Sequence, residues 1–309
     1  MNSEIALRSS GDIIVDRRYT YAHASFEAGD FQAAADLAQQ VIEHAPGFAP
    51  ALALLGRARA ALGEPEQAIA ALSQALAIEP DDVLGVRIDL AHLGVVSPEA
   101  ALTASYVKGL FDDYAPKFER HLIKSLRYRG PELIREAVRW ACAARARPFK
   151  FKHVLDLGCG TGLIGQSFEG LYERLVGVDL SPRMLAMARR THLYHELHDG
   201  DLVSFLAGQP NGAADLITAA DVFVYMASLD EAFAQAYRCL GRRGLFAFTV
   251  QAHLGEGFVL GDDARYAHSE RYLRDLAGEI GFTVVSMEQA SVRQDRGKDV
   301  PGILTVLER

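Results

Sequence analysis

The chain has 309 residues, of which 50% are hydrophobic and 23% charged, as is typical of a globular protein with room for two domains. A net charge of -8 argues against a nucleic-acid-binding surface, because neutralising phosphates requires clustered Lys and Arg. No apolar run is long enough to span a membrane, and the first residues lack the apolar core of a signal peptide. The three cysteines match no zinc-site spacing. We therefore expect a cytoplasmic protein that binds neither membrane nor nucleic acid.

Residues 17–104, which follow a short tail at 1–16, are expected to form a repeat domain, because residues 17–81 repeat themselves with a period of 34. Gly29 and Gly63 are one such pair, and each block has a helix, turn, helix, proline pattern. This period predicts tetratricopeptide-like repeats, with a decayed third copy after residue 81. The repeats either present a concave surface to a peptide, protein partner or second copy, or support the rest of the chain. We favour support or formation of a homodimer, because so few repeats make a short groove.

Residues 105–309 alternate between strand-like and helix-like segments, which predicts an α/β domain built on a parallel sheet. The expected strands are residues 153–157, 175–179, 194–198, 216–221, 245–251, 283–293 and 303–308.

The sequence VLDLGCGTG at residues 154–162 reads as a strand, a tight glycine turn and the start of a helix, which is the beginning of a nucleotide-binding βα unit. Gly160, Gly162 and Gly165 also fit the G-x-G-x-x-G spacing of dinucleotide sites. Asp156 argues against that alternative, since a carboxylate at this turn would repel a pyrophosphate. An acid there favours S-adenosylmethionine, which carries an ammonium and a sulfonium and no phosphate. Asp179, at the end of the next strand, is placed to accept hydrogen bonds from ribose hydroxyls.

Four segments together resemble class I S-adenosylmethionine-dependent methyltransferases: VLDLGCGTG, GVDLSPRML from residue 177, DLITAADVFVYM from residue 215 and LGRRGLFAFTV from residue 240. Residues 111–133 further resemble the segment that precedes the methyltransferase domain in a bacterial branch with tetratricopeptide repeats, and in the human Williams-Beuren-region methyltransferase-like proteins. The resemblance implies a Rossmann-like seven-stranded sheet that closes with a hairpin. It also implies S-adenosyl-L-methionine as the cofactor and a lid at residues 105–130 that carries Tyr114 near the methionine end of the cofactor.

The expected cofactor-binding residues lie at the ends of successive strands. Ser181 is expected to cap the next helix, and Cys159 is expected to be a packed thiol and not a nucleophile. Asp201 resembles the acid that accepts from the adenine amine, although Asp199 fits the same role. The histidines and acids between residues 192 and 202 match no compact metal motif, so we expect no metal. The full set is Tyr114, Asp156, Gly158, Cys159, Gly160, Gly162, Asp179, Leu180, Met184, Asp201, Leu202 and Asp221.

The acceptor is expected at the carboxyl ends of the fourth and fifth strands, where open α/β sheets bind ligands. Within the insertion at residues 252–269, His268 is the candidate base or acceptor-orienting residue, and Tyr266 is the candidate pocket wall. The alternative for His268 is a neighbour of a helix cap at Ser269 with no chemical role. Tyr114 completes the candidate catalytic set, with His121 and Tyr128 as further candidates in the lid. Arg293 could meet an acidic acceptor, but an edge-strand arginine more often lies on a solvated face, and we favour that interpretation.

These residues predict a methyltransferase that acts on an oxygen, nitrogen or sulfur atom of a small molecule. A protein or peptide acceptor held by the repeats is one alternative. An interaction protein that binds the cofactor without turnover is another.

Overall fold

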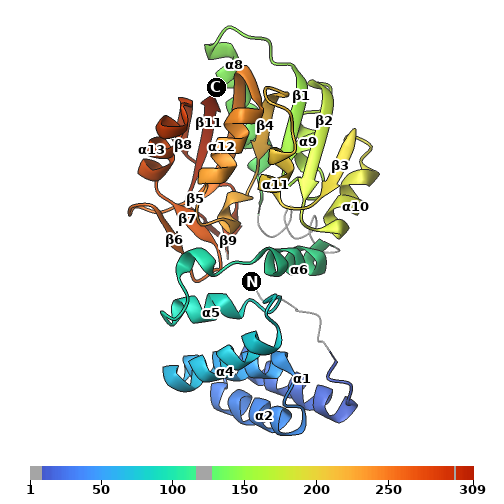
Figure 1. Cartoon of the computed structure of the whole chain (residues 1–309), viewed down its shortest axis with the longest axis vertical. Helices are drawn as coiled ribbons and strands as arrows, with labels where there is room; N and C mark the ends of the chain where they lie inside the picture. Colours follow the sequence, from blue (N-terminus) through green and yellow to red (C-terminus); the bar gives the residue numbers. More distant parts are fainter. Residues whose placement is uncertain (1–8, 116–126, 296) are drawn as a thin grey trace. The chain divides into compact units, whose positions relative to one another are not determined.

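The computed structural model describes residues 9–115, 127–295 and 297–309, and the chain divides into two compact units, Met1–Asp113 and Tyr114–Arg309 (Figure 1). Each unit has its own buried apolar core. The division falls inside a helix, C-terminal to the domain boundary predicted near residue 104.

The described residues of the first unit form helices joined by turns, with no strand among them. Its first four helices form two antiparallel pairs of similar length, and a shorter helix packs against the second pair. The elements are α1 (Ile13–Glu27), α2 (Phe31–His44), α3 (Ala49–Ala61), α4 (Pro65–Ile78), α5 (Val86–His92), the 3-10 turn η1 (Pro98–Ala100) and α6 (Ala104–Tyr114).

Equivalent positions of the two helix pairs have the same structure. Gly29 and Gly63 take φ values of +81° and +77° in the turns within each pair, a conformation that favours glycine. Ala34 and Ala68, also 34 residues apart, are both fully buried. Small residues at these positions let neighbouring helices approach closely, and the helical period predicted from the sequence is therefore present in the structure.

The second unit is built on one sheet with the strand order β3-β2-β1-β4-β5-β11-β8, to which β6 and β7 are attached. Strands β1 to β5 are parallel, and β11 runs antiparallel to both β5 and β8. The strands are β1 (Phe151–Leu157), β2 (Tyr172–Asp179), β3 (Glu196–Asp199), β4 (Ala214–Ala219), β5 (Leu240–Ala252), β6 (Phe258–Leu260), β7 (Tyr266–His268), β8 (Thr283–Gln289) and β11 (Gly302–Glu308).

Helices cover both faces of this sheet. Side chains of α11, α12 and α13 pack on one face, where Phe233, Phe246 and Phe248 are fully buried against one another. Side chains of α8 and α9 pack on the other face. The prediction of a Rossmann-like sheet of seven main strands, with an N-terminal helical repeat domain, is confirmed. The remaining elements are α8 (Gly130–Ala144), α9 (Leu163–Ser167), α10 (Pro182–Arg190), α11 (Leu202–Ala207), the 3-10 turn η3 (Phe223–Tyr225), α12 (Asp230–Cys239) and α13 (Glu270–Ile280).

Two details of the predicted strands are wrong. The strand expected at residues 283–293 ends at Gln289, because the chain then leaves the sheet and the Val292 carbonyl accepts from the Arg129 amide instead. The insertion at residues 252–269 contains the antiparallel pair β6 and β7, which period-2 patterning did not reveal. Between β8 and β11 lies a second small hairpin, β9 (Gln294–Asp295) with β10 (Lys298–Asp299).

No helix in the described ranges combines the length and the apolar composition that crossing a membrane requires.

Candidate functional site

The turn after β1 depends on glycine for its backbone conformation. Gly158, Gly160 and Gly162 have φ values of +60°, +53° and +95°, which side chains disfavour. A Cβ atom on Gly158 would also lie 2.5 Å from Cγ2 of Val222. The turn therefore keeps its backbone bare at the carboxyl edge of the sheet, where a ligand can approach it.

Cys159 is packed inside this turn. Its amide donates a 3.0 Å hydrogen bond to the Val178 carbonyl, and its side chain is buried. Burial raises the pKa of the Cys159 thiol well above its ordinary value, and the charges of Asp156 and Asp179 act in the same direction. A protonated, enclosed thiol fits the predicted packing role and makes a poor nucleophile.

Asp156, at the end of β1, is 1% exposed and has two protein partners. Its Oδ1 accepts a 2.9 Å hydrogen bond from the Thr218 hydroxyl, and its Oδ2 accepts a 2.6 Å bond from the Tyr194 hydroxyl. Burial raises the pKa of Asp156 to about 7, while the two hydroxyls lower it and the charge of Asp179 raises it. The carboxyl is thus poised to ionise near neutral pH, and its predicted role toward a cationic ligand stays a prediction.

Asp179 connects the end of β2 to the glycine turn. Its Oδ2 accepts from the Gly160 amide and its Oδ1 from the Ser181 amide, both at 2.9 Å. Ser181 caps α10 by accepting from the Met184 amide, with a proline at the first helical position, as predicted. Met184 is buried and Leu180 half-buried. The structure therefore brings Asp179 and the glycine turn together at one edge of the sheet.

Asp201 and Asp199 lie in the neighbouring turn. Asp201 is exposed and caps α11 by accepting a 2.9 Å hydrogen bond from the Ser204 amide, immediately before Leu202. Asp199 ends β3 and pairs in register with Asp179. In the described part of the chain, no three His, Cys, Asp or Glu side chains are grouped so as to hold a metal ion.

Asp221 lies just past β4 in a left-handed conformation, with φ +57°. Its amide donates to the Thr249 hydroxyl at 2.9 Å, and its Oδ1 accepts a 2.5 Å hydrogen bond from Nη1 of Arg293. The Arg293 side chain is only 4% exposed and also donates to the Gln251 side chain at 2.9 Å. The interpretation of Arg293 as a solvated edge-strand residue is wrong, because it lies beyond the strand and balances a carboxylate.

Tyr114 lies among other polar groups of the second unit. Burial raises the pKa of Tyr114 to about 12, with a smaller contribution from Tyr225, and the charge of Arg265 opposes this rise. The Arg265 guanidinium lies 5.8 Å from the centre of the Tyr225 ring. Burial and the charges of Asp221 and Asp156 likewise raise the pKa of Tyr128 well above its ordinary value. Residues 116–126 of the predicted lid, which include His121, lie outside the described residues.

His268 and Tyr266 are both buried in β7. The Nε2 atom of His268 lies 2.9 Å from the Ala227 carbonyl, and its ring stacks on Tyr272 with centroids 5.8 Å apart. Its Nδ1 atom is buried and has no hydrogen-bond partner among the described residues. Burial lowers the pKa of His268 to about 4, so the ring is neutral at physiological pH. Ser269 caps α13, as the alternative without a chemical role for His268 expected. A catalytic role for His268 stays a prediction.

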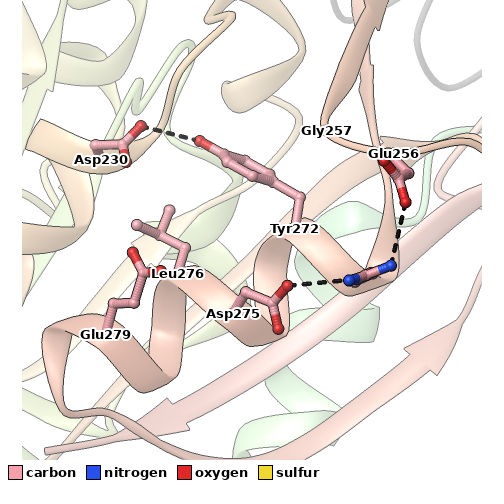
Figure 2. Close-up of a pocket in the computed structure, with 8 residues that line it drawn as sticks. Asp230, Glu256, Gly257, Tyr272, Asp275, Leu276 and Glu279 are labelled. Atoms are coloured by element: carbon pink, nitrogen blue, oxygen red, sulfur yellow. Dashed lines mark hydrogen bonds and ion pairs between the residues drawn. The ribbon is translucent and has the colours of Figure 1, made fainter.

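A hollow of about 370 Å³ opens elsewhere on this unit, between the start of α12, the loop before β6 and α13 (Figure 2). Its ion pairs join Arg271 to Glu256 at 3.1 Å and to Asp275 at 3.6 Å, and the Tyr272 hydroxyl lies 3.2 Å from Asp230. It contains none of the predicted cofactor-binding residues, and its acids are paired or exposed to solvent.

Residues 154–244 match a family of proteins described as "Methyltransferase domain", and residues 25–87 match the tetratricopeptide repeat. The second unit carries a methyltransferase domain. The predicted combination of this domain with tetratricopeptide repeats is confirmed.

Curated relatives resemble parts of the chain. A malonyl-[acyl-carrier protein] O-methyltransferase of Serratia marcescens is 26% identical over 50% of this chain and 61% of the relative. A ubiquinone biosynthesis O-methyltransferase of Thiobacillus denitrificans is 29% identical over 37% of this chain and 50% of the relative. The chain thus spans less than two thirds of these relatives. A solved 1,6-didemethyltoxoflavin-N1-methyltransferase of Burkholderia thailandensis is 18% identical, with a TM-score of 0.49, over 66% of this chain and 88% of that one.

Three contacts that hold the site together were not predicted from the sequence. Tyr194 and Thr218 bind the Asp156 carboxyl, and Arg293 binds Asp221. Tyr194 was expected inside a strand, and no local pattern connects it to a residue 38 positions earlier. The available signal was Asp156 itself. A carboxylate at the end of a strand that is expected to be buried requires polar partners from neighbouring strands.

Proposed function

We propose that the chain transfers a methyl group from S-adenosyl-L-methionine to an oxygen, nitrogen or sulfur atom of a small-molecule acceptor. The observation that carries this proposal is the acidic glycine turn. Asp179 is hydrogen-bonded to the Gly160 amide, and Asp156 lies near enough for the charge of Asp179 to raise its pKa. Two acids at this turn disfavour a pyrophosphate and favour a ligand with ammonium and sulfonium groups. The match to the methyltransferase domain supports the same proposal.

The residues at this edge fit such a cofactor. The turn at residues 158–162 presents backbone, and the Thr161 hydroxyl is a buried donor with no partner among the described residues. Asp179 would accept from the ribose hydroxyls, and Leu180 with Met184 would contact the adenine, beside the cap residue Asp201. When bound, the cofactor supplies a methyl carbon already activated by the adjacent sulfonium.

The contribution of the chain is alignment of the acceptor and control of its proton. With the cofactor bound, the residues at the carboxyl ends of β4 and β5 would hold the acceptor atom facing the activated methyl group. Tyr114, beside Tyr225 and Arg265, is proposed to wall this space. Its high pKa keeps the phenol protonated, so Tyr114 positions the acceptor and does not take its proton.

The remaining predictions about partners are also proposals. The two helix pairs and α5 make a short stack, which supports the catalytic unit or joins two copies of the chain. Cys142, Cys159 and Cys239 are free and buried, in agreement with a reducing compartment such as the cytoplasm.

The test is incubation of the purified chain with labelled S-adenosylmethionine and a fractionated extract of its source. We expect label in a low-molecular-weight product, and none with Asp179→Ala. Label confined to macromolecules contradicts the small-molecule acceptor. The absence of label from every fraction, together with bound cofactor, contradicts catalysis.

A further inference from the structure

Tyr194 lies in the segment between α10 and β3, and its neighbours in the chain are bonded to β2. The His195 amide donates to the Leu175 carbonyl at 2.9 Å, and the Leu175 amide donates to Nδ1 of His195 at 3.1 Å. The Tyr172 hydroxyl donates to the Leu193 carbonyl at 3.2 Å. The backbone that carries Tyr194 is therefore fixed on both sides of this residue.

Three glycines leave the space that the Tyr194 ring fills. A Cβ atom would lie 3.1 Å from this ring at Gly162, 2.9 Å at Gly165 and 2.8 Å at Gly177. Gly162 and Gly165 belong to the start of α9 and Gly177 lies inside β2, so the ring lies between the helix and the sheet. In dinucleotide sites the third glycine of the G-x-G-x-x-G spacing lets the helix pack closely on the strand. Here that glycine, Gly165, makes room for an internal side chain.

The Tyr194 hydroxyl joins this helix to Asp156. It accepts from the Gly165 amide at 3.3 Å and donates to Oδ2 of Asp156 at 2.6 Å. Because an amide can only donate, the hydroxyl proton is directed to the carboxyl group. Such a bond favours the ionised form of Asp156, and the Thr218 hydroxyl on Oδ1 acts in the same direction. One phenol thus influences both the charge of Asp156 and the position of α9.

We propose that Tyr194 is a positioning residue for the cofactor site, which holds Asp156 and the start of α9 together as one unit without contacting the cofactor itself. Binding of a cationic nucleoside depends on two properties that Tyr194 sets. One is a carboxylate that ionises near neutral pH, and the other is a glycine turn whose backbone is in place before the ligand arrives. This inference rests on the proposed function and names a residue that tunes its cofactor site.

The groups around Asp156 allow its ionisation to be followed by pH. Burial raises the pKa of Asp156 to about 7, and the nearby charge of Asp179 raises it further. The other titratable neighbours have pKa values that burial raises above their ordinary values, so they keep their protons at pH 7 and pH 8.5: Cys159, Tyr128, Tyr172 and Tyr194. A variant that changes only the ionisation of Asp156 should therefore differ from the wild type more at pH 7 than at pH 8.5.

The experiment measures binding of S-adenosylhomocysteine to the full chain by calorimetry at both pH values. Tyr194→Phe keeps the ring between the glycines and removes the hydroxyl, so the pKa of Asp156 should rise by about 1. We expect this variant to bind about fivefold more weakly than the wild type at pH 7 and within about twofold of it at pH 8.5. Each comparison is made with the wild type at the same pH, so titration of the ligand cancels.

Two further variants separate the hydroxyl from the ring. Tyr172→Phe is the matched control, because it removes a hydroxyl that bonds to the same segment and leaves the donors of Asp156 in place; its binding should be unchanged at both pH values. Gly165→Ala would push its Cβ atom against the Tyr194 ring, and we expect at least fivefold weaker binding at both pH values. A cooperative urea unfolding transition establishes that each variant is folded before binding is measured.

Equal binding by Tyr194→Phe and the wild type at pH 7 overturns the proposal. A loss of the same size at pH 7 and pH 8.5 also overturns it, because the hydroxyl would then have a structural role that does not act through the charge of Asp156. Unchanged binding by Gly165→Ala contradicts the role of the ring. Failure of the wild type to bind S-adenosylhomocysteine at either pH refutes the proposed function instead.

Discussion

Replacing Asp156 with asparagine should stabilise the unliganded chain at alkaline pH and weaken its binding of S-adenosylhomocysteine. Asp156 is 1% exposed, and burial raises its pKa from 3.8 to about 7. Between these values the folded chain holds a proton that the unfolded chain has released, so wild-type stability falls as pH rises from about 4 to about 7 and is level above.

The size of the effect follows from the shift. At about 1.4 kcal/mol per pKa unit, the shift corresponds to about 4 kcal/mol of destabilisation above pH 7. Asparagine does not ionise, but one of the two hydroxyl partners, Tyr194 or Thr218, must reorient, which costs about 1 to 1.5 kcal/mol. The variant should therefore be more stable than the wild type by about 2 to 3 kcal/mol at pH 8, and less stable by about 1 kcal/mol at pH 4.

Urea unfolding between pH 4 and pH 8, followed by the fluorescence of Trp140, measures this difference. Trp140 is the single tryptophan and lies on α8 of the second unit. Asp199→Asn, which replaces an exposed acid at the end of β3, is the matched control, and its difference in stability from the wild type should be the same at pH 4 and pH 8. In parallel, the S-adenosylhomocysteine affinity of the wild type should rise with pH through about 7, and that of Asp156→Asn should be level. If Asp156→Asn is less stable than the wild type at pH 8, the buried charge of Asp156 does not destabilise the folded chain, and the explanation that it is kept for ligand binding is refuted.

Three further changes test other parts of the site. Tyr194→Phe removes a donor to Asp156, so the pH midpoint for S-adenosylhomocysteine binding should move upward; an unchanged midpoint contradicts the role of that hydroxyl. Gly158→Ala should lower the free energy of unfolding in urea by about 2 kcal/mol, because alanine disfavours the positive φ and its Cβ atom would clash with Val222. Adding Val222→Ala should recover only the part that is due to the clash. The pKa of His268 is lowered from 6.5 to about 4, so the free energy of unfolding should fall as pH drops from about 6.5 to about 4. His268→Phe should flatten this part of the stability profile. A kcat inflection near pH 6.5 that disappears in this variant would instead show a titrating base.

The sequence was informative wherever function depends on local backbone geometry. The glycine turn, the Ser181 cap and the period of the repeats are encoded by residues next to one another, and each is present in the structure. Asp179 could also be placed, because the carboxyl ends of adjacent parallel strands meet at one edge of the sheet.

The missed features depend on contacts between distant segments. Arg293 pairs with Asp221 across 72 positions, and a single sequence contains no signal for such a pair. The hairpin that carries Arg265 has strands of only three residues, too short for a period-2 pattern. His268 drew attention as a titratable residue, yet burial and its contact with a backbone carbonyl decide its charge.

The central claim is that the acidic glycine turn binds a cationic nucleoside through Asp179, and the most direct measurement is calorimetric titration with S-adenosylmethionine and with NAD. We expect the wild type to bind S-adenosylmethionine and not NAD, and Asp179→Ala to lose at least tenfold in affinity. Equal binding by wild type and Asp179→Ala, or binding of NAD in place of S-adenosylmethionine, would contradict it.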